Sequence, residues 1–321
     1  MNQPVLVLID HDRGTIADSA LQGIAFARAC VPQSEVVAVM IGGDTAFPIA
    51  GADAVWHVRH DELSDYAPEA WGDALHQLAT AASPAAVVGA GTERGNEVLA
   101  HVAALADEPF AANVVAATPG SPWPIRRIRW GGSLLEDATL TAALPILSCA
   151  LHAFPVAPPA TTDTIAVNEF VPNLRTDAAR TRIVERVQVA EGITLTTAPV
   201  VVSGGRGVGS EEGFAAIEAL AELLGGAVGC SRVVTNQGWR PHADQVGQTG
   251  KRVAPDLYIA CGISGAIQHW VGMQAAKHVL AINTDRDAPM VTKADYAVIG
   301  DLHEIVPAVV EELRRRRAAT S

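Results

Sequence analysis

The sequence predicts two α/β domains, each built on a doubly wound parallel sheet, and three observations support this prediction. The chain has 321 residues, which is too long for one ordinary domain and suitable for two. Hydrophobic residues make up 49% of the chain and charged residues 18%, which is enough apolar side chain for two cores. Short apolar runs alternate with helical patterns on both sides of a charge-rich stretch, so we expect domains over residues 1–190 and 191–321.

In the N-terminal domain, continuous apolar runs alternate with amphipathic segments. Strands that alternate with helices pair in parallel through right-handed crossovers. The runs are continuous rather than apolar at every second residue, which indicates that helices cover both faces of the sheet. Strands are expected at Val5–Asp10, Val36–Ile41, Ala54–Val58 and Ala85–Gly89, and helices at Ala17–Cys30, Ala70–Ala82 and Asn96–Leu105.

The middle of the chain is less regular, because prolines interrupt it repeatedly. Between two proline-rich loops, Ile125–Trp130 and Ala138–Ala143 are expected to be antiparallel edge strands. Residues 110–190 contain few other clear signals. The segment Arg175–Gly192 is rich in charge and poor in large apolar groups, and we interpret it as a linker arm that permits domain motion.

The C-terminal domain repeats the strand and helix alternation. The helix expected at Glu211–Leu224 has apolar residues near the 3.6-residue period, two acidic residues in its first turn, and Ser210 as its N-cap. Strands are expected at Ala198–Val202, Leu257–Ala260, Val279–Ile282 and Tyr296–Gly300, and further helices at Ala266–Lys277 and Leu302–Arg314.

Charge and cysteine content exclude several classes of protein. The net charge of −12 argues against a nucleic-acid partner, because neutralising phosphates needs a basic surface. The four cysteines are widely spaced, which predicts neither a zinc site nor disulfides and suits a reducing compartment. No metal site is expected, because His57 and His60 lack further ligands. No signal peptide, transit peptide or membrane-spanning run is apparent, so a cytoplasmic bacterial protein without membrane insertion is expected.

Three glycine-rich loops are the candidates for ligand binding. The loop Ser203–Gly209 follows a strand and opens a helix, where backbone N–H groups attract phosphate, and Arg206 can pair with a phosphate bidentately. Its spacing differs from the dinucleotide fingerprint and it has no Walker lysine, so a simple tight turn remains the alternative. Gln245–Gly250 and Cys261–His269 offer small polar groups, amides and one imidazole to a flat heterocycle. Together they indicate a bound cofactor.

The same residues also have plainer interpretations. Ser231 can cap a helix, Arg232 can face solvent, and a lone histidine such as His269 is more often structural than functional. No Ser/His/Asp or Cys/His motif occurs, and no acid–base pair lies near the glycine loops. We therefore predict no catalytic residue and favour a carrier over an enzyme with a substrate.

The C-terminal domain contains a series of motifs in a fixed order: Ser203–Gly207, Ser231–Arg232, Gln245–Gly250, Ala254–Ala260, Gly262–His269, Ala281–Asn283, Ala288–Pro289, Ala294–Tyr296 and Gly300–Leu302. Through these motifs, residues 200–313 resemble the FAD-binding domain of the α subunits of electron transfer flavoproteins. The N-terminal region resembles that family only in its βαβ pattern and its opening Val-Leu-Val-Leu, and residues 110–190 diverge most.

The resemblance implies a non-covalently bound FAD in a Rossmann-like or flavodoxin-like C-terminal domain. Thr249 would donate to the flavin ring nitrogen that gains a proton on reduction, while His269 and Arg232 would favour negative charge on the ring. Ser264 would suit the pyrophosphate, and Asn283 and Asp301 the adenosine end. The contacts implied are Arg206, Ser231, Arg232, Gln245, Val246, Gly247, Gln248, Thr249, Ser264, Gly265, Ala266, Ile267, Gln268, His269, Asn283, Asp301 and Leu302.

The resemblance also implies a function and partners. Such a chain forms a heterodimer with a β subunit that holds AMP or a second FAD, and its N-terminal domain contacts that subunit. It carries electrons from flavin dehydrogenases, such as acyl-CoA or N-methyl amine dehydrogenases, to an acceptor like electron transfer flavoprotein-quinone oxidoreductase. The alternatives are a stand-alone FAD- or nucleotide-dependent oxidoreductase, a bifurcating flavoprotein that accepts electrons from NADH, and a nucleotide-binding regulatory subunit.

Overall fold

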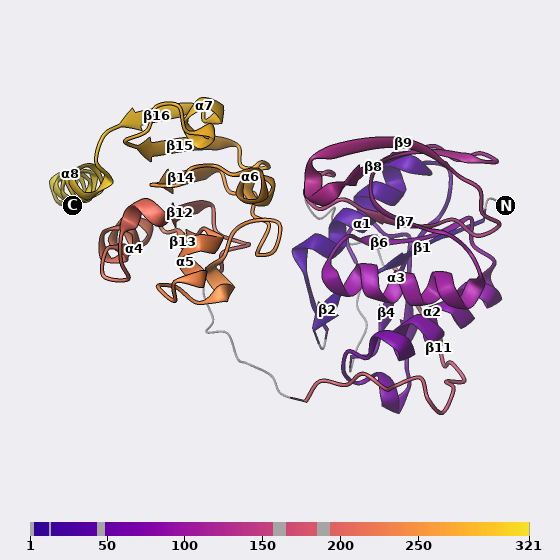
Figure 1. Ribbon diagram of the computed structural model, residues 1–321. Helices are drawn as coiled ribbons and strands as arrows, with labels where there is room; N and C mark the ends of the chain where they lie inside the picture. The colour runs from indigo at the N-terminus through magenta and orange to yellow at the C-terminus, as the bar shows by residue number, and fades with distance from the viewer. Residues whose placement is uncertain (1–2, 13, 44–48, 157–164, 185–192, 321) are drawn as a thin grey trace. The chain divides into compact units, whose positions relative to one another are not determined.

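The computed structural model describes the chain except for residues 1–2, 13, 44–48, 157–164, 185–192 and 321 (Figure 1). The chain divides into two compact units, residues 1–187 and 188–321, and each is described by itself. The expected boundary between residues 190 and 191 falls in a stretch outside the described residues. None of the helices in the described ranges is long and apolar enough to cross a membrane.

The N-terminal unit contains a nine-stranded sheet in the order β11-β5-β4-β1-β6-β10-β7-β8-β9 (Figure 1). All neighbouring strands are parallel except β7 with β8 and β8 with β9. A short antiparallel pair, β2 (His11–Asp12) and β3 (Thr15–Ile16), lies apart from this sheet. The sheet consists of β1 (Val5–Leu8), β4 (Val36–Ile41), β5 (Ala54–Val58), β6 (Ala86–Ala90), β7 (Phe110–Ala117), β8 (Trp123–Arg129), β9 (Leu134–Leu140), β10 (Ile146–Cys149) and β11 (Ala166–Phe170).

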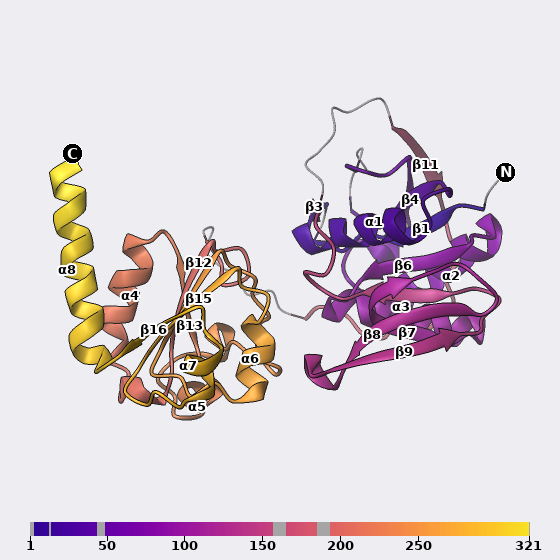
Figure 2. The ribbon, with the colours of Figure 1, turned by 90° about the horizontal axis from the view of Figure 1, so that it is seen from above.

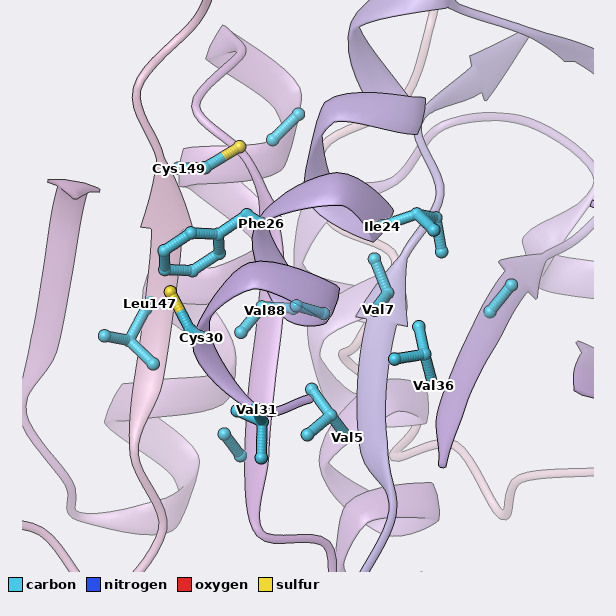
Figure 3. Close-up of a cluster of buried hydrophobic side chains, with 14 of the residues drawn as sticks. Val5, Val7, Ile24, Phe26, Cys30, Val31, Val36, Val88, Leu147 and Cys149 are labelled. Carbon is cyan, nitrogen blue, oxygen red and sulfur yellow. The ribbon is translucent and has the colours of Figure 1, made fainter. Parts of the chain in front are cut away.

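Helices cover both faces of this sheet. Successive residues of β1 point to opposite faces, so Val5 and Val7 join one core cluster while Leu6 and Leu8 join the other. Figure 3 shows Val5 and Val7 near residues of α1, including Ile24. Burial on both faces explains why the strand is continuously apolar. The first face is covered by α1 (Asp18–Cys30), and the second by α2 (Pro68–Ala82) and α3 (Glu93–Ala106).

Three strands of the nine-stranded sheet, and the short pair β2 and β3, were not expected from the sequence. The two expected antiparallel strands are present as β8 and β9, but only β9 forms an edge of the sheet, because β8 lies between β7 and β9. β7 and β10 were not expected from the sequence. β10 is fully buried in the sheet but has only four residues, which is a short apolar run. β11 is mostly exposed, so it carries no alternating pattern, and its pairing with β5 brings together residues more than a hundred positions apart.

The expected linker arm is partly docked on the N-terminal unit. Ala178 is buried in the hydrophobic cluster to which α2 also contributes. The backbone N–H of Arg175 donates to Asp73 at 3.2 Å, and the Thr181 hydroxyl donates to Glu69 at 2.7 Å. The interpretation of Arg175–Gly192 as a linker arm is therefore wrong for residues 175–182, because hydrogen bonds hold residues 173–182 on α2. Residues 185–192 of the expected arm lie outside the described residues.

The C-terminal unit contains a five-stranded, fully parallel sheet in the order β13-β12-β14-β15-β16. Counted along the chain this order is 2-1-3-4-5, which is typical of flavodoxin-like doubly wound folds. Together with the N-terminal sheet, it confirms the predicted α/β fold class. The strands are β12 (Val200–Gly204), β13 (Ala227–Cys230), β14 (Leu257–Cys261), β15 (His278–Asn283) and β16 (Tyr296–Ile299).

Helices pack on both faces of the second sheet, and α4 and α8 lie side by side (Figure 2). Ser210 does not cap α4, which begins at Phe214; its hydroxyl accepts the N–H of Gly213 at 3.3 Å in the preceding turn. The helix expected at Ala266–Lys277 is shorter, and β13, α5 and α7 were not expected. The helices are α4 (Phe214–Leu223), α5 (Arg232–Asn236), α6 (Ile267–Met273), α7 (Pro289–Lys293) and α8 (Leu302–Thr320).

Candidate functional site

A cavity of about 540 Å³ lies at the carboxyl end of the C-terminal sheet. Residues that follow each of the five strands line it, which is where open α/β sheets bind ligands. Its volume lies within the range usual for small-molecule and cofactor sites. Eleven of the expected contact residues line this cavity: Arg206, Ser231, Arg232, Ser264, Gly265, Ala266, Gln268, His269, Asn283, Asp301 and Leu302.

Nine lining residues were not among the expected contacts, although five of them lie in the motifs that carry the resemblance. Each lies within a few residues of the carboxyl end of a strand. Because open α/β sheets bind ligands at these ends, the positions of the strands alone indicate these segments as candidates. Most are small or uncharged, so they present no distinctive chemical group in the sequence. They are Gly207, Val233, Asn236, Gly262, Ile263, Thr284, Asp285, Ala288 and Gly300.

Glycines allow two loops to meet backbone to backbone at the cavity. The N–H of Gly207 donates to the carbonyl of Gly262 at 3.1 Å, and a Cβ on Gly205 would lie 2.3 Å from that same oxygen. Gly265 has a φ of +84°, and a Cβ there would lie 2.3 Å from the backbone nitrogen of Met290. These positions exclude side chains, so backbone groups form this part of the wall and a ligand can approach them closely.

Two arginines give the cavity positive charge. Arg206 and Arg232 are exposed, and neither has an ion-pair partner within the described part of the chain. A guanidinium keeps its charge at any physiological pH and matches phosphate geometry. Asp285 and Asp301 add negative charge at the ends of β15 and β16. The donor set therefore suits a ligand that combines phosphates with hydroxyl or amine groups.

Asn283 and Asp301 also brace the loops that carry them. The Asn283 amide donates to the carbonyl of Ile263 at 3.1 Å, and its oxygen accepts the N–H of Asp285 at 3.1 Å. The Asp301 carboxylate accepts the N–H of His303 at 2.9 Å, at the start of α8. Each side chain retains lone pairs for a ligand after these contacts.

His269 lines the cavity, but its ring nitrogens are turned inward. The side chain is 7% exposed, and Nε2 lies 2.9 Å from the hydroxyl of the fully buried Tyr258. Nδ1 is also buried and makes no hydrogen bond of normal geometry within the described residues. Burial lowers the pKa of His269 to about 4, and the backbone of Val246 raises it by less. The imidazole is therefore neutral at pH 7, and both of its ring nitrogens are buried.

The loop at residues 245–249 lies beside the cavity rather than in its lining. The N–H of Val246 donates to the carbonyl of Cys230 at 2.9 Å, and that of Gln248 donates to Gln268 at 2.7 Å. Gly272 has no side chain, and a Cβ there would lie 2.3 Å from the nitrogen of Gly247. The loop is thus held against α5 and α6, which both contribute to the wall. The expected contacts outside the lining are Gln245, Val246, Gly247, Gln248, Thr249 and Ile267.

Comparisons with known proteins cover both units. Residues 194–274 match the family model described as the electron transfer flavoprotein FAD-binding domain, and residues 5–201 match the electron transfer flavoprotein domain. The electron transfer flavoprotein subunit alpha of Mycobacterium tuberculosis (strain H37Rv) is 38% identical over 98% of this chain and 99% of its own. That of Bacillus subtilis is 33% identical over 98% of both chains. The mitochondrial subunit of Arabidopsis thaliana is 33% identical, over 97% of this chain and 90% of its own.

Proposed function

The chain belongs to the family of electron transfer flavoprotein α subunits, and from this premise we propose where its FAD lies and how its residues serve electron transfer. FAD is its cofactor, and its role is electron transport. When bound, the flavin ring supplies the redox chemistry by accepting and releasing electrons. The proposal concerns what the residues of this chain contribute around it.

We propose that FAD occupies the cavity at the carboxyl ends of β12 to β16. The observation that carries this proposal is the convergence of all five strand ends on one cavity with two exposed arginines that form no ion pair with the described residues. Arg206, Ser264 and the glycine loops would hold the pyrophosphate, because they combine a positive charge and a hydroxyl with a wall from which side chains are absent. Asn283 and Asp301 would bind the adenosine end with their remaining acceptors.

The flavin ring would lie near Arg232 and the loop at residues 245–249. Arg232 provides a permanent positive charge, which favours an electron-rich ring over a neutral one. Thr249 is exposed and would donate its hydroxyl hydrogen to the ring nitrogen that gains a proton on reduction. The neutral, inward-facing His269 would contribute shape and rigidity rather than charge.

We also propose the partners of the chain. The names of its relatives describe them as subunits, which supports a complex with a β subunit that holds AMP or a second FAD. The N-terminal unit would contact that subunit, and the C-terminal unit would carry FAD. Electrons would pass from flavin dehydrogenases to a quinone-linked acceptor, without a substrate reaction on this chain. Co-expression with a β subunit should give a one-to-one complex by native mass spectrometry, and a chain that stays alone would contradict this.

The FAD site is tested by titrating flavin-free, full-length protein with FAD. Arg206→Ala and Arg232→Ala should each weaken the affinity about tenfold or more, because a hydrogen bond to a charged group contributes about 1.5–3 kcal/mol. Arg314→Ala, near the end of α8, removes an exposed arginine away from the cavity and should leave the affinity unchanged. Unchanged affinities in both cavity variants would show that FAD binds elsewhere.

A further inference from the structure

Gln245 is almost completely buried, and both ends of its amide have hydrogen-bond partners. Its exposed fraction is 2%. The hydroxyl of Thr235, on α5, lies 2.7 Å from Oε1, and Nε2 donates to the hydroxyl oxygen of Thr249 at 3.0 Å. α5 begins with the cavity-lining Arg232, and Thr249 is exposed on the neighbouring loop. Gln245 therefore links one wall of the cavity to the Thr249 hydroxyl.

The hydrogen bonds that join Thr235, Gln245 and Thr249 can be arranged in two ways. A threonine hydroxyl has one hydrogen, but Thr235 has two acceptors in reach: Gln245, and the carbonyl of Arg232 at 2.9 Å. If Thr235 donates to Gln245, the amide NH₂ faces Thr249 and leaves the Thr249 hydrogen free. If Thr235 donates to Arg232, the amide turns over and accepts that hydrogen.

Backbone hydrogen bonds hold the loop that carries Thr249. Val246 is tied to Cys230 at the end of β13, and Gln248 is tied to Gln268 in the cavity wall. The orientation of one buried amide thus decides whether Thr249 offers a hydrogen or a lone pair outward. Gln245 itself has too little exposed surface to serve as a contact residue.

We propose that Gln245 is a positioning residue that orients the Thr249 hydroxyl as a hydrogen-bond donor to the oxidised flavin. The ring nitrogen that gains a proton on reduction has only a lone pair in the oxidised flavin, so it selects the arrangement in which Thr249 has a free hydrogen. This inference rests on the proposed function, since it requires the flavin ring beside this loop. It replaces the expectation that Gln245 touches FAD directly.

The test compares FAD with 5-deaza-FAD, in which a C–H group replaces that nitrogen and cannot accept a hydrogen bond. The full-length chain, with any subunit that remains bound to it, is freed of flavin and titrated with each compound. The wild-type chain should bind FAD about two- to tenfold tighter than 5-deaza-FAD, the range expected for one hydrogen bond. Thr249→Val removes the donor and defines the baseline ratio of the two affinities.

Gln245→Met keeps the length of the side chain but removes both hydrogen bonds. It should move the affinity ratio to the Thr249→Val baseline while the affinity for 5-deaza-FAD changes less than about twofold. Gln274→Met makes the same substitution at an exposed glutamine and should leave the ratio at the wild-type value. If Gln245→Met does not fold, Thr235→Val should lower the ratio by removing the amide's anchor, and Thr235→Ser should retain it.

Two results would overturn the inference: equal affinities of the wild-type chain for the two flavins, or an affinity ratio in Gln245→Met that stays at the wild-type value, including the case of an equal loss of affinity for both flavins. An equal loss would mean that Gln245 only supports the packing of the loop. These results differ from failure of the proposed function, in which the wild-type chain would bind neither flavin.

Discussion

Acidification should destabilise the C-terminal unit through His269. The folded chain holds this imidazole neutral, with its pKa lowered by burial to about 4, whereas the unfolded chain restores the ordinary value of 6.5. As the pH falls below 6.5 the unfolded state takes up a proton that the folded state does not, so the stability decreases with decreasing pH. The loss develops between pH 6.5 and 4 and is complete below the folded-state pKa.

The size of this effect follows from the two pKa values. One pKa unit corresponds to about 1.4 kcal/mol, so the full difference amounts to about 3 kcal/mol, of which about 2 kcal/mol is lost between pH 7 and pH 5. Because His269 is 7% exposed, solvent screening does not reduce this value much.

The measurement is urea unfolding of flavin-free protein at pH 7, 6 and 5, compared with His269→Gln. The variant lacks the titrating group, so its free energy of unfolding should fall by about 2 kcal/mol less than that of the wild type over this range. His11 is also buried with a lowered pKa, in the N-terminal unit, and the comparison cancels its contribution. Parallel pH profiles, or an NMR titration of the His269 ring centred near pH 6.5, would refute the reasoning.

Two further predictions concern the packing around the site and the docked segment. Gly265→Ala should lower the free energy of unfolding by about 2–4 kcal/mol, because it adds overlap with the Met290 backbone to the strain of a positive φ. Gly209→Ala has a similar φ but open surroundings, so it should cost about 1 kcal/mol; equal losses in urea unfolding would argue against the overlap. Asp73→Ala removes the acceptor of the Arg175 N–H and should speed proteolysis around residues 175–192, while an unchanged cleavage rate would mean that the other contacts suffice.

The fold was largely predictable from local patterns. Continuous apolar runs such as Val5–Leu8 identify strands covered on both faces, and the glycine loop after Val200–Gly204 marks the carboxyl edge of the second sheet. β11 was missed because an exposed strand carries no periodic pattern and becomes a strand only through its pairing with β5. Docking of residues 173–182 was missed for a similar reason, since its polar contacts are with a helix about a hundred residues away.

The candidate site was predictable as a set of segments but not as a set of roles. Eleven expected residues line the cavity because strand ends in a parallel sheet converge on one edge. Nothing in the local sequence shows that His269 forms a hydrogen bond with Tyr258, or that the buried Gln245 donates one to Thr249. Those orientations depend on β14 and α5, which pack against the loops only in the folded chain.

By itself, the sequence determined the two α/β domains, the glycine loops and, through its ordered motifs, the cofactor. These features depend on residue types and spacings along the chain, which a short window displays. The loops at Gln245 and Cys261 were expected in this way to bind a cofactor, and the resemblance to electron transfer flavoproteins implied that they belong to its FAD site. Only the tertiary structure decided which of their side chains face the cavity and which turn inward, because burial and hydrogen-bond partners come from segments distant in sequence.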